Sequence, residues 1–277
     1  MKYKSLFIAI IVSFFPLGGV SANRENFHSK INDVDINYDN TISQNHREKK
    51  IAQEYLDQAK NIIIDDYTPL LSKNKKEREE FIRLVNKSLE TNETARGYLY
   101  LGHAGFMAFN SHGNKKAVEN YEKAIELNPE YVEAFIALGS LHKNNQNAEG
   151  VITNYGEAIR LDSDNDVLYG EIGIAKQDIG DHKGAIIDLE KAMKVNPHNA
   201  LTYFHSGQSK HFLGDFKGAG NDFSKAIELN PESANYYFFR AFAYLDQNDI
   251  RNGCQDLENA SKLGANSTKQ IKKYCKI

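Results

Sequence analysis

A period of 34 residues constrains what this sequence can fold into more than any other feature. The stretch Gly214 to Pro231 reads as one amphipathic helix with a Gly-Asp start and an Asn-Pro end, and its pattern returns at each step of the period. A unit this short cannot bury its own apolar face, so a strict repeat predicts units stacked into a solenoid. The columns in register are Ala124, Ala158, Ala192, Ala226 and Ala260; Pro129, Ser163, Pro197 and Pro231; Tyr121, Tyr155, Leu189, Phe223 and Leu257; and Leu127, Leu161, Val195, Leu229 and Leu263.

Each repeat also contains an earlier helix with an aromatic residue at its start and a small residue four positions later. The aromatic residues are Phe135, Tyr169, Tyr203 and Tyr237, and the small ones are Gly139, Gly173, Gly207 and Ala241. Helices that cross at about 8 to 10 Å leave no room for a long side chain at the crossing point. The small residues therefore predict close pairing of the two helices, with aromatic side chains filling the space beside them. The Asn-Pro pairs end the second helix, because the residue before proline avoids helical dihedrals.

These residues resemble the tetratricopeptide repeat family, from about Tyr98 to Gly264. The resemblance implies an all-α fold, an α-solenoid in which antiparallel helix pairs form a right-handed superhelix with a concave inner face. It implies no single activity. Family members that bind peptides place variable residues on the concave side of the first helices.

The first 22 residues have the form of a secretory signal peptide. Lys2 and Lys4 precede an apolar run of about ten residues, glycines and a proline interrupt it, and small residues follow at the expected cleavage position. An uncleaved membrane anchor is the alternative, although such an anchor needs a longer apolar span. No cysteine follows the run, so lipid attachment there is excluded. We expect a mature chain beginning near Asn23, without a membrane span, in the periplasm or secreted.

The rest of the chain divides into four parts by composition and periodicity. Residues 23–44 are polar and predict a disordered leader. Residues 45–92 predict two helices, a first one to about residue 71 and a second over about 75–90, which form a degenerate first repeat. Residues 93–264 are the array of about five repeats, and residues 265–277 predict a short last helix through Thr268 to Tyr274, capped by Asn266-Ser267.

The sequence contains two cysteines, Cys254 and Cys275, in the last repeat and the cap. An even pair in an exported chain favours a disulfide, which would clamp the cap onto the last repeat. Two free buried thiols are the alternative. Neither a C-x-x-C motif nor a Cys/His cluster is present, so zinc binding and thioredoxin-like chemistry are poorly supported.

Composition and motifs argue against catalysis and against cofactor, metal or nucleic-acid binding. The formal net charge is -3, without the clustered cations that phosphate binding requires. His205 and His211 are expected on different faces of one helix, so a metal pair is not predicted. Asp162, Asp164 and Asp166 alternate like an EF-hand opening, but Val167 stands where the loop needs glycine. We therefore expect no enzyme, no cofactor and no metal site.

The resemblance places positions 2, 5, 9, 12 and 13 of each first helix on the concave side. Four phenylalanines there, Phe204, Phe212, Phe238 and Phe242, are of the kind that anchors a partner in a groove. The alternative is that these rings pack among themselves as core. A carboxylate clamp of Lys, Asn and Arg is poorly matched. The candidate groove residues are Ile136, Ser140, Lys143, Ile174, Gln177, Phe204, Gln208, His211, Phe212, Phe238, Phe242 and Asp246.

The sequence thus favours a non-catalytic scaffold outside the cytoplasm that holds a peptide segment or partner protein in the concave groove. Self-assembly into a homo-oligomer is the first alternative, since an open array can pair through its groove or its N-terminal helices. An unrecognised exported hydrolase or metal-binding protein is the second.

Overall fold

The fold is known from a computed structural model, which describes residues 43–61, 75–107, 111–163 and 165–275. The expected signal peptide, nearly all of the expected leader and the part of the first expected helix beyond residue 61 lie outside these residues. Within the described part of the chain, no helix combines the length and apolar character that crossing a bilayer requires.

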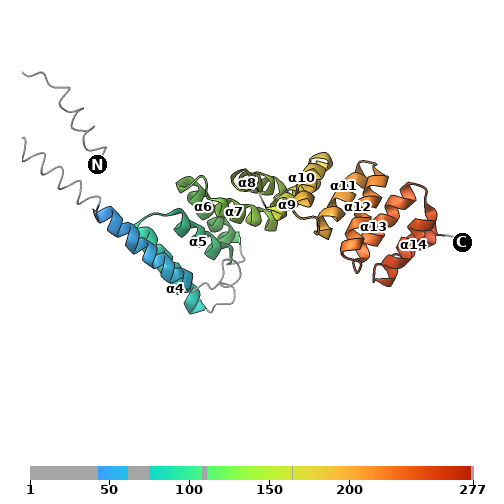
Figure 1. The fold of residues 1–277 in the computed structure, drawn as a ribbon. Coiled ribbons are helices and arrows are strands. Elements are labelled where there is room, and N and C mark those ends of the chain that lie inside the picture. Colours follow the sequence, from blue (N-terminus) through green and yellow to red (C-terminus); the bar gives the residue numbers. More distant parts are fainter. Residues whose placement is uncertain (1–42, 62–74, 108–110, 164, 276–277) are drawn as a thin grey trace, which may run out of the picture.

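The described residues form helices and no strand, and the predicted all-α solenoid is confirmed (Figure 1). A helix over 43–61 precedes α4 (Lys75–Thr91), and short turns then join helices in pairs. The pairs are α5 (Ala95–Phe106) with α6 (Ser111–Leu127), α7 (Val132–Asn144) with α8 (Ala148–Leu161), α9 (Asp166–Asp178) with α10 (His182–Val195), α11 (Ala200–Phe212) with α12 (Phe216–Leu229), and α13 (Ala234–Asp246) with α14 (Ile250–Lys262).

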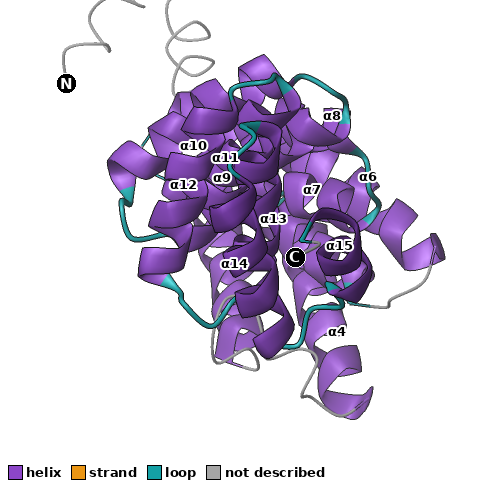
Figure 2. Cartoon of the chain, turned by 90° about the vertical axis from the view of Figure 1, so that its right-hand side faces the viewer, coloured by secondary structure: helices purple, strands orange, loops and turns teal. Residues whose placement is uncertain are grey.

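Partners within a pair make the most extensive contacts, and each second helix also packs on the first helix of the next pair. The pairs therefore follow one another along one elongated array, from α4 at one end to α14 at the other (Figure 1). The short α15 (Thr268–Tyr274) lies beside the last pair (Figure 2). Because contacts are made mainly between neighbours, each stretch of the array has its own local core.

The Gly-Asp signals explain how one helix ends and the next begins. Gly180 and Gly214 adopt left-handed dihedrals, φ 81° and 84°, which glycine tolerates without strain. The aspartates that follow, Asp181 and Asp215, accept a hydrogen bond at 2.9 Å from the backbone N–H three residues later. Each carboxylate satisfies a donor that the helix itself leaves free, so the turn and the new helix are specified together.

The small residues lie at the helix crossings, as the sequence predicts. A Cβ atom on Gly139 would lie 2.4 Å from Cδ1 of Tyr155, and one on Gly207 would lie 2.7 Å from Cε1 of Phe223. Tyr155 and Phe223 belong to the same aromatic column of the repeat and are buried. Each ring thus occupies the space that the missing side chain leaves.

At the N-terminal end, the helix over 43–61 packs on α4. Leu56 and Ala59 contact the buried side chains of Phe81, Leu84 and Val85. The Ser88 hydroxyl donates to the Ala52 carbonyl oxygen at 2.8 Å across this contact.

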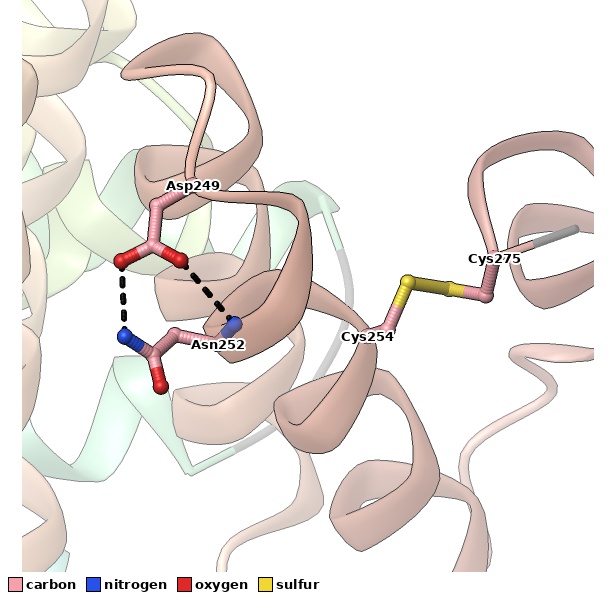
Figure 3. The surroundings of a disulfide bond; sticks show 4 residues. All are labelled: Asp249, Asn252, Cys254 and Cys275. Carbon is pink, nitrogen blue, oxygen red and sulfur yellow. Dashed lines mark hydrogen bonds between the residues drawn. A yellow bond between two sulfur atoms is a disulfide. The ribbon is translucent and has the colours of Figure 1, made fainter. Parts of the chain in front are cut away.

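At the C-terminal end, Ser267 immediately precedes α15, but its side chain makes no capping hydrogen bond. The structure joins Cys254 of α14 to Cys275, with Cα atoms 5.6 Å apart (Figure 3). The Tyr274 ring also meets the Phe242 ring edge-on, with centroids 6.4 Å apart. The link and the ring contact hold the short helix on the end of the array.

We expect the Cys254–Cys275 bond to stabilise the last repeat by about 3 kcal/mol, because it closes a short loop in the unfolded chain. Denaturant unfolding of the oxidised chain and of Cys275→Ser, followed by circular dichroism, measures the difference. Intact mass spectrometry with a thiol-reactive label, without reduction, checks the premise. Two labelled thiols per chain would contradict it.

Candidate functional site

A cavity of about 390 Å³ lies between the first helices of neighbouring repeats. Helices α9 and α11 supply most of its wall, and α10 and α13 supply one residue each. Its lining residues are Ile174, Gln177, Asp178, His182, His205, Gln208, His211, Phe212 and Phe239. Five of these are among the candidates predicted from the sequence: Ile174, Gln177, Gln208, His211 and Phe212.

Gln177 of α9 and His205 of α11 form the polar floor of this cavity. The Gln177 amide nitrogen donates to the His205 carbonyl oxygen and to the Ser209 hydroxyl, both at 2.7 Å. The Gln177 amide oxygen lies 3.1 Å from Nδ1 of His205. Burial lowers the pKa of His205, although a side-chain hydrogen bond with Gln208 opposes the shift. A neutral His205 whose Nδ1–H donates to Gln177 satisfies this geometry, and the network fixes α9 against α11.

Phe212 forms the exposed rim of the cavity. It is the last residue of α11, and its side chain is 73% exposed, the highest value among the exposed large hydrophobic residues in the described chain. One face of the ring stacks on His182 of α10, with centroids 3.8 Å apart. The other face is open to solvent. Nδ1 of His182 is buried beside the cavity and has no hydrogen-bond partner within the described residues.

His205 and His211 both line this cavity, although six residues along α11 separate them by about a third of a turn around the helix, so they lie on different faces. Nε2 of His211 lies 2.8 Å from a carboxylate oxygen of Asp246, which ties α11 to the end of α13. Across the described residues, no group of three His, Cys, Asp or Glu side chains is placed to hold a metal ion.

Phe204 belongs to the core, which corrects its place among the groove candidates. Its side chain is 9% exposed, and its ring lies 5.0 to 5.9 Å from the rings of Tyr236, Phe239 and Phe223. Helix α13 carries aromatic side chains toward α11, and Phe204 fills the space between them. The ring is therefore unavailable to a partner.

The remaining candidates lie on α7 and α13, away from the cavity lining. On α7, the Ser140 hydroxyl is 3.0 Å from the Tyr155 hydroxyl, and Lys143 forms an ion pair with Glu171 of α9. On α13, the half-buried rings of Phe238 and Phe242 meet edge-on at 5.1 Å. Phe242 also contacts Tyr274 of the cap, so this pair of rings is continuous with the end of the array.

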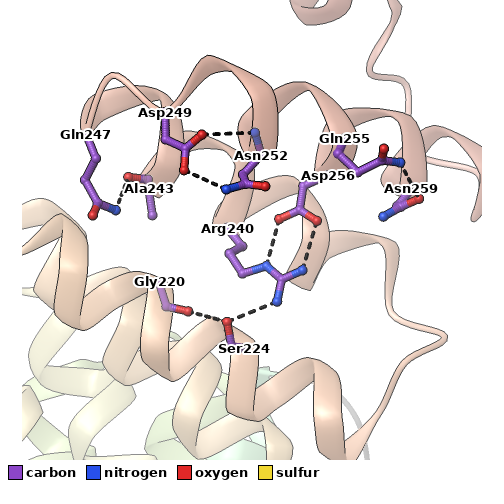
Figure 4. Close-up of polar contacts among 10 residues, drawn as sticks. All are labelled: Gly220, Ser224, Arg240, Ala243, Gln247, Asp249, Asn252, Gln255, Asp256 and Asn259. Carbon is purple, nitrogen blue, oxygen red and sulfur yellow. Dashed lines mark hydrogen bonds and ion pairs between the residues drawn. The ribbon is translucent and has the colours of Figure 1, made fainter.

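In each of three successive repeats, an ion pair joins the first helix to the second helix of the same repeat. Lys176 pairs with Asp188 and Lys210 with Asp222, each at 2.6 Å. In the last repeat, the Arg240 guanidinium forms a bidentate ion pair with the Asp256 carboxylate at 2.7 and 2.9 Å. Its third nitrogen donates to the Ser224 hydroxyl (Figure 4). Sequence reasoning missed this series. The signal was available, because the aspartates recur at the period of 34 residues.

Comparison with known proteins identifies the repeats. Family models match residues 114–146 as a TPR repeat, and residues 167–199 and 200–233 as tetratricopeptide repeats. The chain therefore carries tetratricopeptide repeats, as the resemblance indicates. The two last matches cover α9 to α12 and thus most of the cavity. A search of curated proteins finds no match to this chain.

Several solved structures share the fold. The chain is 20% identical to MamA (TM-score 0.59, covering 67% of this chain and 97% of that one). It is 19% identical to YrrB, described as a TPR protein with an unusual peptide-binding site (TM-score 0.60, covering 68% and 97%). It is 12% identical to PilF of Pseudomonas aeruginosa (TM-score 0.58, covering 82% and 98%). At these identities, the likeness is one of fold.

Proposed function

We propose that this tetratricopeptide-repeat chain is a non-catalytic scaffold that binds a peptide segment of a partner protein in the cavity between α9 and α11. The observation that carries the proposal is the Phe212 rim. An aromatic ring that stays 73% exposed at the mouth of a cavity of about 390 Å³ offers apolar area that folding leaves unused. Rings of this kind supply much of the binding energy in protein interfaces.

The surroundings of Phe212 suit a peptide rather than a small reactant. The cavity floor is held by the Gln177 network, so it is formed before a partner arrives. Leu201 and Val167, near the starts of α11 and α9, are 57% and 56% exposed. Gly170 lies between Val167 and Ile174, and a Cβ atom added there would meet nothing within 4 Å, so the face of α9 is open at this point. An extended segment can follow this face from Val167 to the cavity.

The proposed place of action is outside the cytoplasm, in the periplasm or secreted. Two features support it: the signal-like composition of residues 1–22 and the joined pair of Cys254 and Cys275. Disulfides persist in oxidising compartments. Intact mass of the chain recovered from its native cells tests the location. A chain that retains Met1 and two reduced thiols would contradict it.

We expect Phe212→Ala to lower peptide capture by at least about tenfold, because the substitution removes the main apolar contact. Selection from a display library of random peptides against the immobilised wild-type chain supplies the ligands. Fluorescence anisotropy then measures their affinity for both chains. Because the Phe212 ring is exposed, the melting temperature of the variant should stay close to that of wild type.

Two results would overturn this proposal. One is a failure of the wild-type chain to enrich any peptide sequence, and the other is equal affinity of the selected peptides for wild type and Phe212→Ala. Sedimentation of the wild-type chain over a range of concentrations is the control for self-association. Dimers that dissociate on Phe212→Ala would assign the rim to a second copy of the chain instead.

A further inference from the structure

The Lys and Arg side chains on the first helix of each repeat form ion pairs within the array. Helices α9, α11 and α13 each contain a single Lys or Arg: Lys176, Lys210 and Arg240. All three side chains form ion pairs with aspartates of the second helices, at 2.6 to 2.7 Å. The pairs anchor these cations at Asp188, Asp222 and Asp256, which are themselves buried or nearly so. None of the three cations lines the cavity.

The one cation of α7 is also engaged. Lys143 pairs with Glu171 of α9, so it neutralises a neighbouring acid and is not free for a partner's carboxylate. A site that binds an acidic peptide needs cations with unused donors. Along α7, α9, α11 and α13, every Lys and Arg of the described structure already has an acidic partner.

Asp178 is the one acidic residue among those that line the cavity. It lines the cavity, its side chain is exposed, and no hydrogen bond or ion pair engages its carboxylate within the described residues. It is also the last residue of α9. An anion there is unfavourable, because the partial charge at the C-terminal end of a helix is negative. Residues that reduce stability without a structural role are often retained for function.

The apolar walls around Asp178 fit the stem of a long basic side chain. Ile174, one turn earlier on α9, and Phe212 of α11 line the same cavity. The methylene groups of Lys or Arg can cover such surface while the charged end stays near water. The open face of the Phe212 ring is also a favourable position for a cation.

From these contacts we propose that the cavity takes a Lys or Arg side chain from an extended segment of a partner protein, with Asp178 as its counter-ion and Phe212 as its apolar platform. This inference rests on the proposed function and names the chemistry of its partner.

The test is the composition of the peptides that the full chain selects from the random display library. We expect Lys or Arg enriched at one position beside an apolar residue. Replacing that basic residue by glutamine in a synthetic peptide should weaken binding about tenfold. Asp178→Asn should weaken binding of the basic peptide about threefold to tenfold, with little effect on the glutamine peptide. Raising the salt concentration should also weaken the basic peptide selectively.

Asp178→Lys provides the sharper variant, since a cation at the end of α9 suits the helix and should not impair folding. We expect its selected peptides to lose their basic residue and gain Asp or Glu. Glu190→Lys, an equal charge change at an exposed position of α10 outside the cavity, should leave the wild-type selection unchanged. Enrichment of acidic or purely apolar peptides by wild type would overturn this inference but leave peptide binding intact. No enrichment at all would overturn both.

Discussion

Phe204→Ala is expected to lower the free energy of unfolding by about 3–5 kcal/mol, the cost of removing a buried aromatic ring from a core that cannot collapse around the gap. The ring is 9% exposed and meets aromatic rings from α12 and α13 at 5.0 to 5.9 Å. Denaturant unfolding monitored by helical circular dichroism measures the loss. Because contacts in a repeat array are local, hydrogen exchange should rise first in α11 to α13.

Phe212→Ala is the matched control, since it deletes the same side chain from the same helix eight residues later. We expect it to change the free energy of unfolding by less than about 1 kcal/mol, as is usual for an exposed position. A small loss for Phe204→Ala together with a large loss for Phe212→Ala would reverse the assignment of the two rings.

Asp256→Ala is expected to lower the free energy of unfolding by about 3 kcal/mol. The Asp256 side chain is 4% exposed, and its removal leaves the Arg240 guanidinium, 18% exposed, without its counter-ion. Arginine stays protonated at any pH that the fold tolerates, so the free-energy cost of the unpaired, partly buried charge is not relieved by deprotonation. Equilibrium unfolding in urea measures the difference from wild type.

The double variant Arg240→Met with Asp256→Leu tests whether the lost stability comes from the unpaired charge or from other contacts of Asp256. Replacing both charges by apolar side chains removes the unpaired ion, so we expect most of the lost stability to return. If Asp256→Ala alone hardly changes the free energy of unfolding, the Arg240 side chain reaches solvent in the variant and the ion pair contributes little stability. If the double variant is no more stable than Asp256→Ala, the destabilisation comes from another loss, such as packing around α14.

The fold could be predicted because its signals repeat. The column that holds Tyr155, Leu189 and Phe223 meets Gly139, Gly173 and Gly207 at successive crossings, so the same physical requirement appears in several repeats. Asp181 and Asp215 cap helices in the same way. A signal that recurs at a fixed period stands out from the composition of the chain.

The candidate site was harder to predict because it depends on residues that break the period. Phe204 and Phe212 both occupy positions that the family pattern turns inward, yet one is buried and the other exposed. The difference comes from α13, whose aromatic side chains cover Phe204 but make no ring contact with Phe212. Contacts between repeats of this kind depend on how the helices are rotated, which a sequence pattern alone does not specify.

His182 shows a second limit of the sequence pattern. It is the first residue of α10, directly after the capping Asp181, where the sequence favours a solvated position, and yet its ring stacks on Phe212 at the mouth of the cavity. His182 belongs to one repeat and the Phe212 ring belongs to the next. The family pattern places Asp178 on the concave side, but its unpaired charge depends on ion pairs that engage the cations of α7, α9 and α11, and those pairs are visible only in three dimensions.

Site-specific photo-crosslinking tests the central claim most directly. A photoreactive amino acid is placed at position 208, in the cavity, and in a separate variant at position 190, an exposed position of α10. Each variant is activated by light in the native cells. The account predicts that position 208 forms a covalent adduct with another protein and that Phe212→Ala abolishes this adduct. The same adduct should not form from position 190. Adducts from position 190 alone, or from position 208 only with another copy of this chain, would contradict it.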